Sequence, residues 1–181
     1  VSSINRARSG ARLGQHFLTT RPPALALARA VNIQTGEPVL EIGPGKGILT
    51  KYLSEKSGKV LAIEVDRNIA KFCDNKIKQW GTERKIKIIE GDILKINLPK
   101  LIEENNFRDY KVVANLPFYL TAPVIRMFLE MKEVQPLSLT LVVQKEVAQR
   151  ICAKPPKMSI LANAVQFYAE PELISVISKE S

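Results

Sequence analysis

Five short runs of hydrophobic residues recur between positions 38 and 143, and each is rich in branched aliphatic side chains. Runs of this length, bounded by turn residues, are typical of buried β-strands. They cover residues 38–42, 60–64, 86–90, 111–115 and 139–143. A later run, "ELISVIS" at 172–178, has the same character and is a candidate for one more strand.

Longer segments with a helical spacing of apolar positions lie between and after these runs. The helices expected there cover residues 47–56, 67–80, 98–105, 121–132, 144–153 and 159–168. We expect another helix before the first strand, capped by Thr19 or Thr20 and ending near Asn32. Strands that alternate with helices predict an α/β fold with a mostly parallel sheet flanked by helices.

The composition fits one soluble globular domain, because 45% of the 181 residues are hydrophobic and 25% are charged. The 27 Lys and Arg residues exceed the 18 Asp and Glu residues and give a net charge of +9. Such a charge favours a polyanionic partner, either nucleic acid or an anionic membrane surface. Residues 1–14 carry Arg6, Arg8 and Arg12 without an apolar repeat, which indicates a flexible basic arm.

The cysteine and histidine content excludes several kinds of chemistry. Cys73 and Cys152 are the two cysteines, and neither has a Cys or His at metal-binding spacing, so no metal is expected. His16 is the single histidine, and nucleophilic catalysis of the Ser-His-Asp type would require it as the base. No apolar run approaches the length of a membrane span. We therefore expect a cytoplasmic protein with reduced thiols.

The loop after the first expected strand reads "EIGPGKG" and places glycines at 43, 45 and 47. Ligands of parallel sheets bind beyond the carboxyl ends of the strands. Glycines there permit a tight turn and a close approach of the ligand to the backbone. Position 48 is Ile, so the GxGxxG spacing of dinucleotide enzymes is not met. The spacing instead resembles the ExGxGxG loop of S-adenosylmethionine-dependent methyltransferases, with a purely structural turn as the alternative.

Two acidic residues follow the next two strands. Glu64 stands 21 residues after Gly43, where a carboxylate can accept hydrogen bonds from both ribose hydroxyls of a nucleoside cofactor. Asp92, in "GDIL", could accept from the exocyclic amine of adenine while Ile93 packs on the ring. A helix or turn cap is the alternative role for Asp92. Together the three strand ends predict a nucleoside site.

The fourth strand ends in "NLPFYLTAP", where an amide and two aromatic rings stand together. The exocyclic nitrogen of adenine is a poor nucleophile, because its lone pair is delocalised into the ring. The Asn115 side-chain carbonyl and the Leu116 backbone carbonyl, fixed by Pro117, could accept its two hydrogens and turn the lone pair toward a methyl donor. Phe118 could stack on a flipped base, with Tyr119 nearby. The alternative is a turn with Phe118 packed inward.

The combination of motifs resembles the ribosomal RNA adenine N6-dimethyltransferases of the KsgA type, a class I methyltransferase family. The matching segments are "LGQHFL" (13–18), "EIGPGKGILT" (41–50), "EVD" (64–66), "GDIL" (91–94), "NLPFYLTAPVI" (115–125) and "VQKEVAQRICAKP" (143–155). The resemblance implies a Rossmann-like fold and the transfer of two methyl groups from S-adenosylmethionine to N6 of each of two adjacent adenines. These adenines lie near the 3′ end of small-subunit rRNA, so the implied partner is this rRNA or the pre-ribosomal small subunit.

The resemblance also implies site residues. For the cofactor they are His16, Leu18, Gly43, Gly45, Glu64, Val65, Asp92, Ile93 and Asn115. For the target adenine they are Asn115, Leu116, Pro117 and Phe118. Many relatives have Asn in place of His16 and Tyr in place of Phe118, and both replacements keep the required hydrogen bond or stacking face.

The resemblance divides the chain into the basic arm, 1–14, and a methyltransferase catalytic domain, 15–181. Family members continue with a closing strand and a helical domain that helps to bind rRNA, and this sequence stops before them. The segment "AKPPKMSIL" is also shorter than its expected counterpart. We expect a monomer that binds no metal and no membrane.

Two alternatives to the small-subunit enzyme remain open. One is the related class that methylates one adenine of large-subunit rRNA and confers macrolide resistance, which shares the cofactor site and a similar clamp. The basic arm and "QKEVAQR" favour the small-subunit interpretation. DNA adenine methyltransferases are disfavoured, because they usually carry a second Pro where this chain has Leu116. The other alternative is a non-catalytic ribosome assembly factor that binds rRNA through its basic surface.

Overall fold

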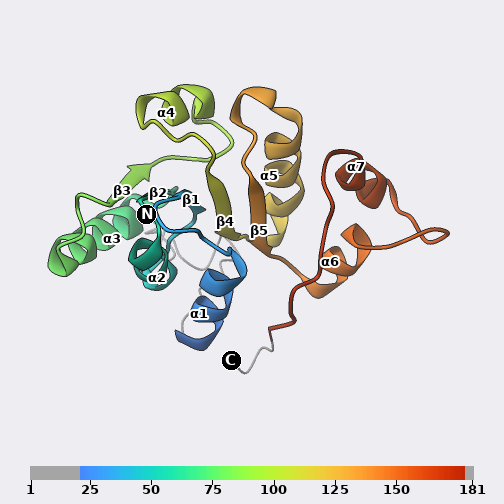
Figure 1. Ribbon diagram of the computed structural model, residues 1–181, viewed down its shortest axis with the longest axis horizontal. Coiled ribbons are helices and arrows are strands. Elements are labelled where there is room, and N and C mark those ends of the chain that lie inside the picture. Colours follow the sequence, from blue (N-terminus) through green and yellow to red (C-terminus); the bar gives the residue numbers. More distant parts are fainter. Residues whose placement is uncertain (1–20, 178–181) are drawn as a thin grey trace, which may run out of the picture.

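The computed structural model of the chain describes residues 21–177, and five strands within this range form one parallel sheet (Figure 1). The strands are β1 (Pro38–Ile42), β2 (Lys59–Glu64), β3 (Ile86–Glu90), β4 (Lys111–Asn115) and β5 (Ser138–Val142). Their order across the sheet is β3-β2-β1-β4-β5. The five predicted strands are confirmed, with ends that differ by at most one residue. The strand order reverses between β1 and β4, which leaves a crevice beyond their carboxyl ends.

The helices of the described range alternate with these strands, as expected. They are α1 (Arg21–Ala30), α2 (Ile48–Lys56), α3 (Arg67–Trp80), α4 (Leu98–Glu104), α5 (Phe118–Glu130), α6 (Lys145–Ile151) and α7 (Ile160–Tyr168), with a short 3₁₀ helix η2 (Lys132–Val134). Their termini carry ordinary capping signals. Asp66, for example, accepts hydrogen bonds from the backbone N–H groups of Asn68 and Ile69 at the start of α3.

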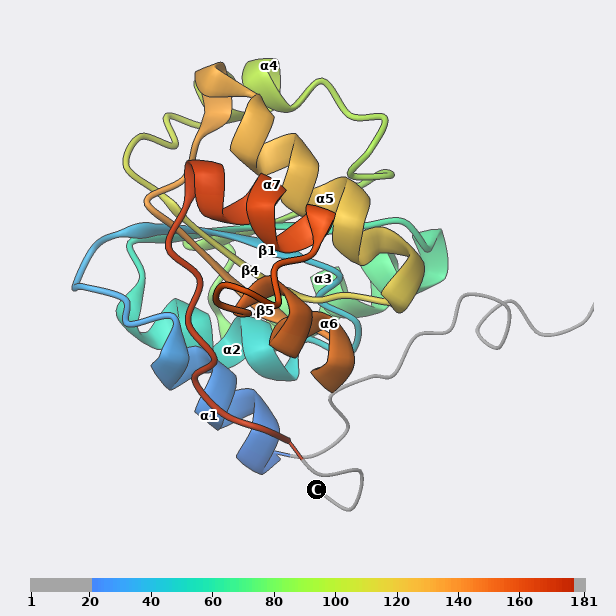
Figure 2. The same cartoon turned by 90° about the vertical axis from the view of Figure 1, so that its right-hand side faces the viewer.

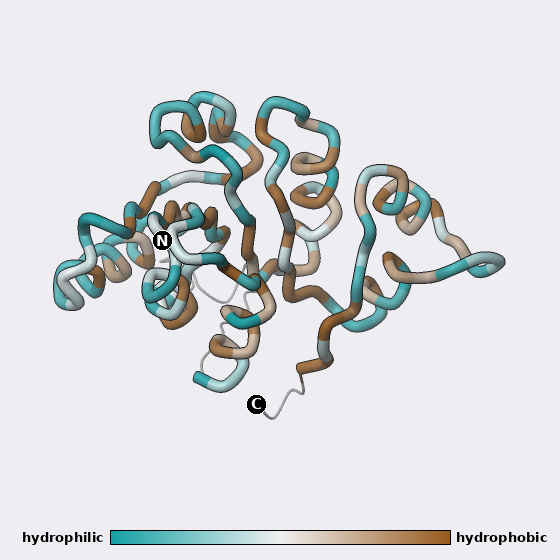
Figure 3. The backbone as a smooth tube through the Cα atoms, viewed as in Figure 1, coloured by the Kyte–Doolittle hydropathy of each residue, from teal (hydrophilic) through white to brown (hydrophobic). Residues whose placement is uncertain are grey.

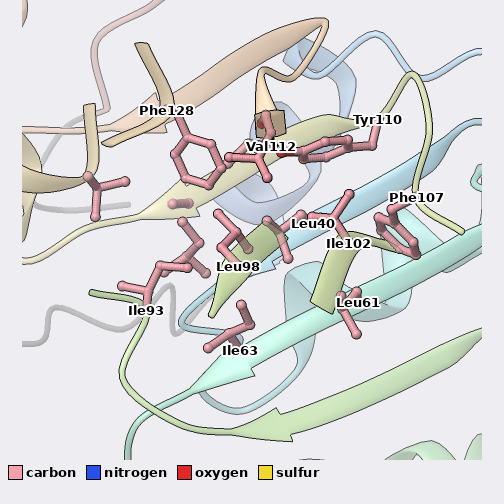
Figure 4. Packing of buried hydrophobic residues seen from close by; sticks show 14 of the residues in the cluster. Leu40, Leu61, Ile63, Ile93, Leu98, Ile102, Phe107, Tyr110, Val112 and Phe128 are labelled. Atoms are coloured by element: carbon pink, nitrogen blue, oxygen red, sulfur yellow. Dashed lines mark hydrogen bonds between the residues drawn. The ribbon is translucent and has the colours of Figure 1, made fainter. Parts of the chain in front are cut away.

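The sheet is covered on both faces, as Figure 2 shows with α4 and α5 above it and α1 and α2 below it. On one face, strand residues such as Leu40 and Val112 pack against Leu98 of α4 and Phe128 of α5 (Figure 4). On the other face a second core joins the strands to α1, α2 and α3. Burial on both faces explains why the strands read as continuous apolar runs.

Helix α5 begins at Phe118, three residues before the predicted start at 121. The turn that was expected to contain Phe118 and Tyr119 is shorter, because Pro117 occupies the N-cap with φ −59° and the helix follows at once. Pro123 consequently lies inside the helix and not in its first turn. The aromatic residues of the motif therefore belong to a helix and not to a loop.

The prediction of a strand at 172–178 is wrong for the residues that the structure describes, since none of residues 172–177 is in a strand. Figure 3 shows the apolar character of this segment. Its larger side chains are nevertheless exposed, with Ile174 at 58% and Val176 at 59%. An apolar run forms a strand only where a neighbouring strand supplies backbone hydrogen bonds, and this run has no such neighbour within the described range.

The helix expected before the first strand is present, and its end differs slightly from the prediction. The caps Thr19 and Thr20 and the basic arm lie outside the described residues, whereas α1 ends at Ala30, two residues before the predicted end. Cys73 is buried and Cys152 is half-buried, and both are free thiols, as predicted.

Across residues 21–177, no helix is long and apolar enough to cross a membrane.

Candidate active site

A cavity of about 300 Å³ lies at the carboxyl edge of the sheet, between the loops that follow β1, β2, β3 and β4. It contains most of the site residues that the sequence predicts. Those in its lining are Gly43, Gly45, Glu64, Val65, Asp92, Ile93, Asn115, Leu116 and Pro117. Phe118 is absent from the lining, and His16 and Leu18 lie outside the described residues. Parallel topology brings these segments together, because all five strands end at the same edge.

Glu64 forms one wall of the cavity and is almost completely buried, with 1% of its surface exposed. Its carboxylate accepts hydrogen bonds from the backbone N–H of Asp66 at 3.0 Å and of Gly45 at 3.3 Å. Burial raises the pKa of Glu64, and these N–H groups offset part of that rise. The carboxylate thus ties the end of β2 to the glycine loop after β1.

The glycine loop is shaped by backbone conformations that other residues rarely adopt. Gly47 has φ +78° and caps α2. A Cβ atom at Gly47 would lie 3.1 Å from the Cys73 sulfur and 3.2 Å from the Trp80 ring. The absence of a side chain at Gly47 therefore lets α3 pack directly beneath the loop.

Glu41 is a second buried carboxyl group in the cavity wall, and the sequence analysis gave it no role. Neither of its carboxyl oxygens has a hydrogen-bond partner among the described residues. Burial raises the pKa of Glu41 to about 8, and the Glu64 carboxylate adds to that rise. Glu41 is therefore mainly protonated at neutral pH. The signal that could have identified it is a single acidic residue inside an otherwise apolar strand.

Asp92 has the capping role that was the alternative for it, and its side chain also lines the cavity. One carboxylate oxygen accepts a hydrogen bond from the Leu94 N–H at 3.0 Å, so Asp92 caps the turn after β3. The other oxygen lies 3.5 Å from the Lys95 ammonium. The side chain is 31% exposed and lines the cavity, while Ile93 is buried in the adjoining core. The capping bond holds the carboxylate in a fixed position at the cavity.

Asn115 is the last residue of β4, and Leu116 is the first residue of the short turn between β4 and α5. The Leu116 N–H donates to the Val142 carbonyl at 3.2 Å, which anchors this turn to β5. Phe118 is 60% exposed, and its ring meets the Tyr119 ring edge-on with centroids 6.2 Å apart. The exposed ring of Phe118 contradicts the alternative in which it packs inward.

Tyr119 lines the cavity, although the sequence analysis placed it only nearby. Burial raises the pKa of Tyr119, and the carboxylates of Asp92 and Glu64 raise it further. These causes place the Tyr119 hydroxyl in the electrostatic field of the cavity. The early start of α5 turns Tyr119 toward the cavity, and that start was not visible in the hydrophobic pattern.

The charge of the cavity is predominantly negative. The carboxylates of Glu64 and Asp92 line it together with the protonated Glu41, whereas Lys46 is the one Lys or Arg among its described lining residues. Negative groups in a partly enclosed site favour a cationic ligand. No cluster of three metal-binding side chains occurs among residues 21–177.

The strand order, the glycine loop after β1 and the acidic residues after β2 and β3 define the Rossmann-like fold class of the S-adenosylmethionine-dependent methyltransferases. Solved structures of the same fold agree with this class. The dimethyladenosine transferase from Plasmodium falciparum matches 83% of this chain and 52% of its own, with a TM-score of 0.69 and 25% identity. The 23S rRNA methyltransferase ErmE matches 74% of this chain and 50% of its own, with a TM-score of 0.62 and 26% identity.

The chain belongs to the ribosomal RNA adenine dimethylase family, whose model matches residues 6–180. The ribosomal RNA small subunit methyltransferase A of Dehalococcoides mccartyi is 40% identical over 172 residues, which cover 95% of this chain. The protein of the same name from Alkaliphilus oremlandii is 39% identical over 165 residues, or 90% of this chain. In both cases the chain matches 56% of the relative's length. The family resemblance and the fold class predicted from the sequence are confirmed.

Proposed function

We propose that this chain transfers methyl groups from S-adenosylmethionine to N6 of two adjacent adenines near the 3′ end of small-subunit rRNA. The observation that carries the proposal is the convergence of Glu64, Asp92 and Asn115 on one cavity. These residues come from three different strand ends, so only the folded chain unites them. The family membership supports adenine in rRNA as the target, and the relatives' names support the small subunit.

The cavity fits a positively charged nucleoside. S-adenosylmethionine, when bound, supplies a methyl group on a sulfonium and also carries an ammonium group. Glu64 would accept hydrogen bonds from the ribose hydroxyls, and Asp92 from the adenine amine of the cofactor. The buried position of Glu64 favours this role, because its backbone bonds already fix the carboxylate before a ligand binds. The negative charge of the wall would compensate the two positive groups of the cofactor.

The residues after β4 would hold the target base. The Asn115 side-chain carbonyl and the Leu116 backbone carbonyl would accept the two N6 hydrogens, which makes the nitrogen pyramidal and directs its lone pair. The cofactor would supply the methyl carbon from its sulfonium, N6 would bond to that carbon as the sulfur–carbon bond breaks, and one N6 proton would leave to solvent. The exposed Phe118 ring offers a face on which the flipped base would stack.

The test is the transfer of labelled methyl groups by this chain to unmethylated small ribosomal subunits, with digestion of the rRNA to nucleosides. We expect N6,N6-dimethyladenosine as the product, at two adjacent positions. Large-subunit rRNA serves as the comparison substrate. Methylation of the large subunit alone would support the resistance-type alternative, and binding without methyl transfer would support the assembly-factor alternative. The monomeric state and the cytoplasmic location stay predictions.

A further inference from the structure

A second concave surface lies on the other side of the glycine loop, and we call it the basic groove. It is formed by the start of α1, the loop after β1, and the outer sides of α2 and α3. Its lining residues are Arg21, Lys46, Ile48, Lys51, Tyr52, Glu55, Lys76 and Trp80. Lys46 and Ile48 also line the candidate active site, so one loop separates the two concave surfaces.

The positive charges of the basic groove are not neutralised by the described part of the chain. Arg21, Lys46, Lys51 and Lys76 line the groove, against Glu55 as its one acidic residue in the described range. None of these four cations forms an ion pair with a described residue, although Lys and Arg elsewhere do so. A cluster of unpaired cations in a concavity attracts a polyanion.

Aromatic rings interleave with these cations. The Lys51 ammonium lies 5.7 Å from the centroid of the Trp80 ring, a distance at which a cation and a ring attract each other. The edge of the same indole lies against Gly47, where an added Cβ would be 3.2 Å from the ring carbon Cη2. This packing positions Lys51 at the groove without using its charge in an ion pair. Basic side chains that alternate with rings are a common feature of RNA-binding grooves.

The cofactor of the proposed reaction does not account for the basic groove. S-adenosylmethionine has no phosphate group, and its sulfonium and ammonium outweigh its one carboxylate, so a cluster of four Lys and Arg side chains does not match its net positive charge. The negative lining of the active site matches that cofactor instead. The groove therefore requires a different, anionic ligand, and it must be one that can reach past the Lys46 loop.

We propose that the basic groove binds the sugar-phosphate backbone of the rRNA that flanks the target adenine. This inference rests on the proposed function and adds a docking surface to it. The target base would enter the cavity at Asn115, while the neighbouring strand passes over the Lys46 loop and places its phosphates between Lys51 and Lys76. Such contacts position the RNA without reading its sequence.

The test replaces two groove lysines that do not line the active site, as Lys51→Gln/Lys76→Gln. Binding of the chain to naked unmethylated small-subunit rRNA is measured over a range of salt concentrations. We expect affinity to fall about tenfold at moderate salt, and the slope of log K against log salt to shrink by about 1 to 2. Lys51→Arg/Lys76→Arg should restore both. Cofactor binding should not change in either variant, which also verifies the fold.

The matched control is Lys59→Gln/Lys157→Gln, which removes the same charge from two exposed positions outside the groove. This control should change affinity much less. An unchanged salt slope in the groove variant would overturn the proposal. So would a loss of binding to intact subunits without any loss on naked rRNA, because a ribosomal protein would then be the partner. Failure of the proposed function has a different signature, namely no methyl transfer by the unmodified chain.

Discussion

The active site and the basic groove share one loop, yet they differ in every property that decides what they bind. The cavity is lined by the carboxylates of Glu64 and Asp92 and by the protonated carboxyl group of Glu41, whereas the groove is lined by four Lys and Arg side chains. The cavity is built from strand ends and the groove from the sides of helices. The comparison teaches that a chain with net charge +9 can still present a negative pocket to a cationic ligand, provided that its charges are separated in space.

The strongest way to sharpen this comparison is Asn115→Ala, which removes the proposed base contact without changing either charge pattern. We expect methyl transfer to fall by about 10²- to 10³-fold, as on loss of an oriented polar group at a reacting atom. Binding of cofactor and of RNA should change little. A single-turnover assay with labelled methyl groups measures the transfer rate, and calorimetry measures the binding of cofactor and of RNA. Asn75→Ala, at an exposed position of α3, is the control, and retained turnover in Asn115→Ala would remove the assigned clamp.

Glu64→Ala removes a carboxylate from the cavity and leaves the charges of the basic groove unchanged. Cofactor binding should weaken by about 1–3 kcal/mol, because hydrogen bonds to a charged group are lost. Binding of rRNA should stay the same, since the residue does not line the groove. Calorimetric titration measures the affinity for the cofactor, and a filter-binding assay measures the affinity for rRNA. Glu64→Gln keeps the shape and isolates the effect of charge. Equal cofactor affinity in all three proteins would contradict the ribose role.

Gly47→Ala tests whether the two regions depend on the same loop. The added Cβ would meet Cys73 and Trp80 at 3.1 and 3.2 Å in a backbone conformation with φ +78°, so we expect a loss of about 2 kcal/mol in unfolding free energy. Cofactor and RNA binding should weaken together. Gly36→Ala is the matched control, because Gly36 has φ +89° but no atom within 4 Å of the added carbon. A loss confined to one ligand would show that the regions are independent.

Glu41→Gln should have the smallest effect on the binding of either ligand, and its effect should instead appear as a changed pH dependence of stability. Because the pKa of Glu41 is raised from 4.5 to about 8, the folded chain keeps a proton that the unfolded chain releases between these values. Stability should therefore fall as pH rises from 5 to 8, and Glu41→Gln should reduce that fall by on the order of 3 kcal/mol. Urea unfolding at both pH values measures the difference. Identical pH profiles would show that Glu41 is ionised in the folded chain.

The strands and the order of their terminal loops were predictable, because the central strands are buried on both faces and each of the five strands is followed by turn residues. That is why Gly43, Glu64, Asp92 and Asn115 could be assigned to one site before the fold was known. The start of α5 could not be predicted, since a helix N-terminus at Pro117 depends on the preceding turn as much as on propensity. The prediction of a strand at 172–178 was wrong for a different reason, because high β-propensity does not supply the partner strand that a β-strand needs.

The buried carboxyl group of Glu41 and the basic groove were missed for opposite reasons. Glu41 belongs to a recognised motif, but its burial depends on the packing of the glycine loop, which no local pattern reveals. The groove draws Lys51, Lys76 and Trp80 from two helices, where each is an ordinary surface or half-buried residue. Only the contact between α2 and α3 brings their charges together. Properties that depend on such contacts between helices are invisible in a linear sequence.

The packing of Trp80 beneath Gly47 also gives the molecule an optical reporter. Trp80 is the single tryptophan of the chain, so its ultraviolet emission comes from one known position beside the loop. A ligand that displaces the loop, or that quenches the indole from the groove, will change this emission without any added label. Occupancy on the two sides of the loop can thus be followed in the unmodified protein by stopped-flow fluorescence.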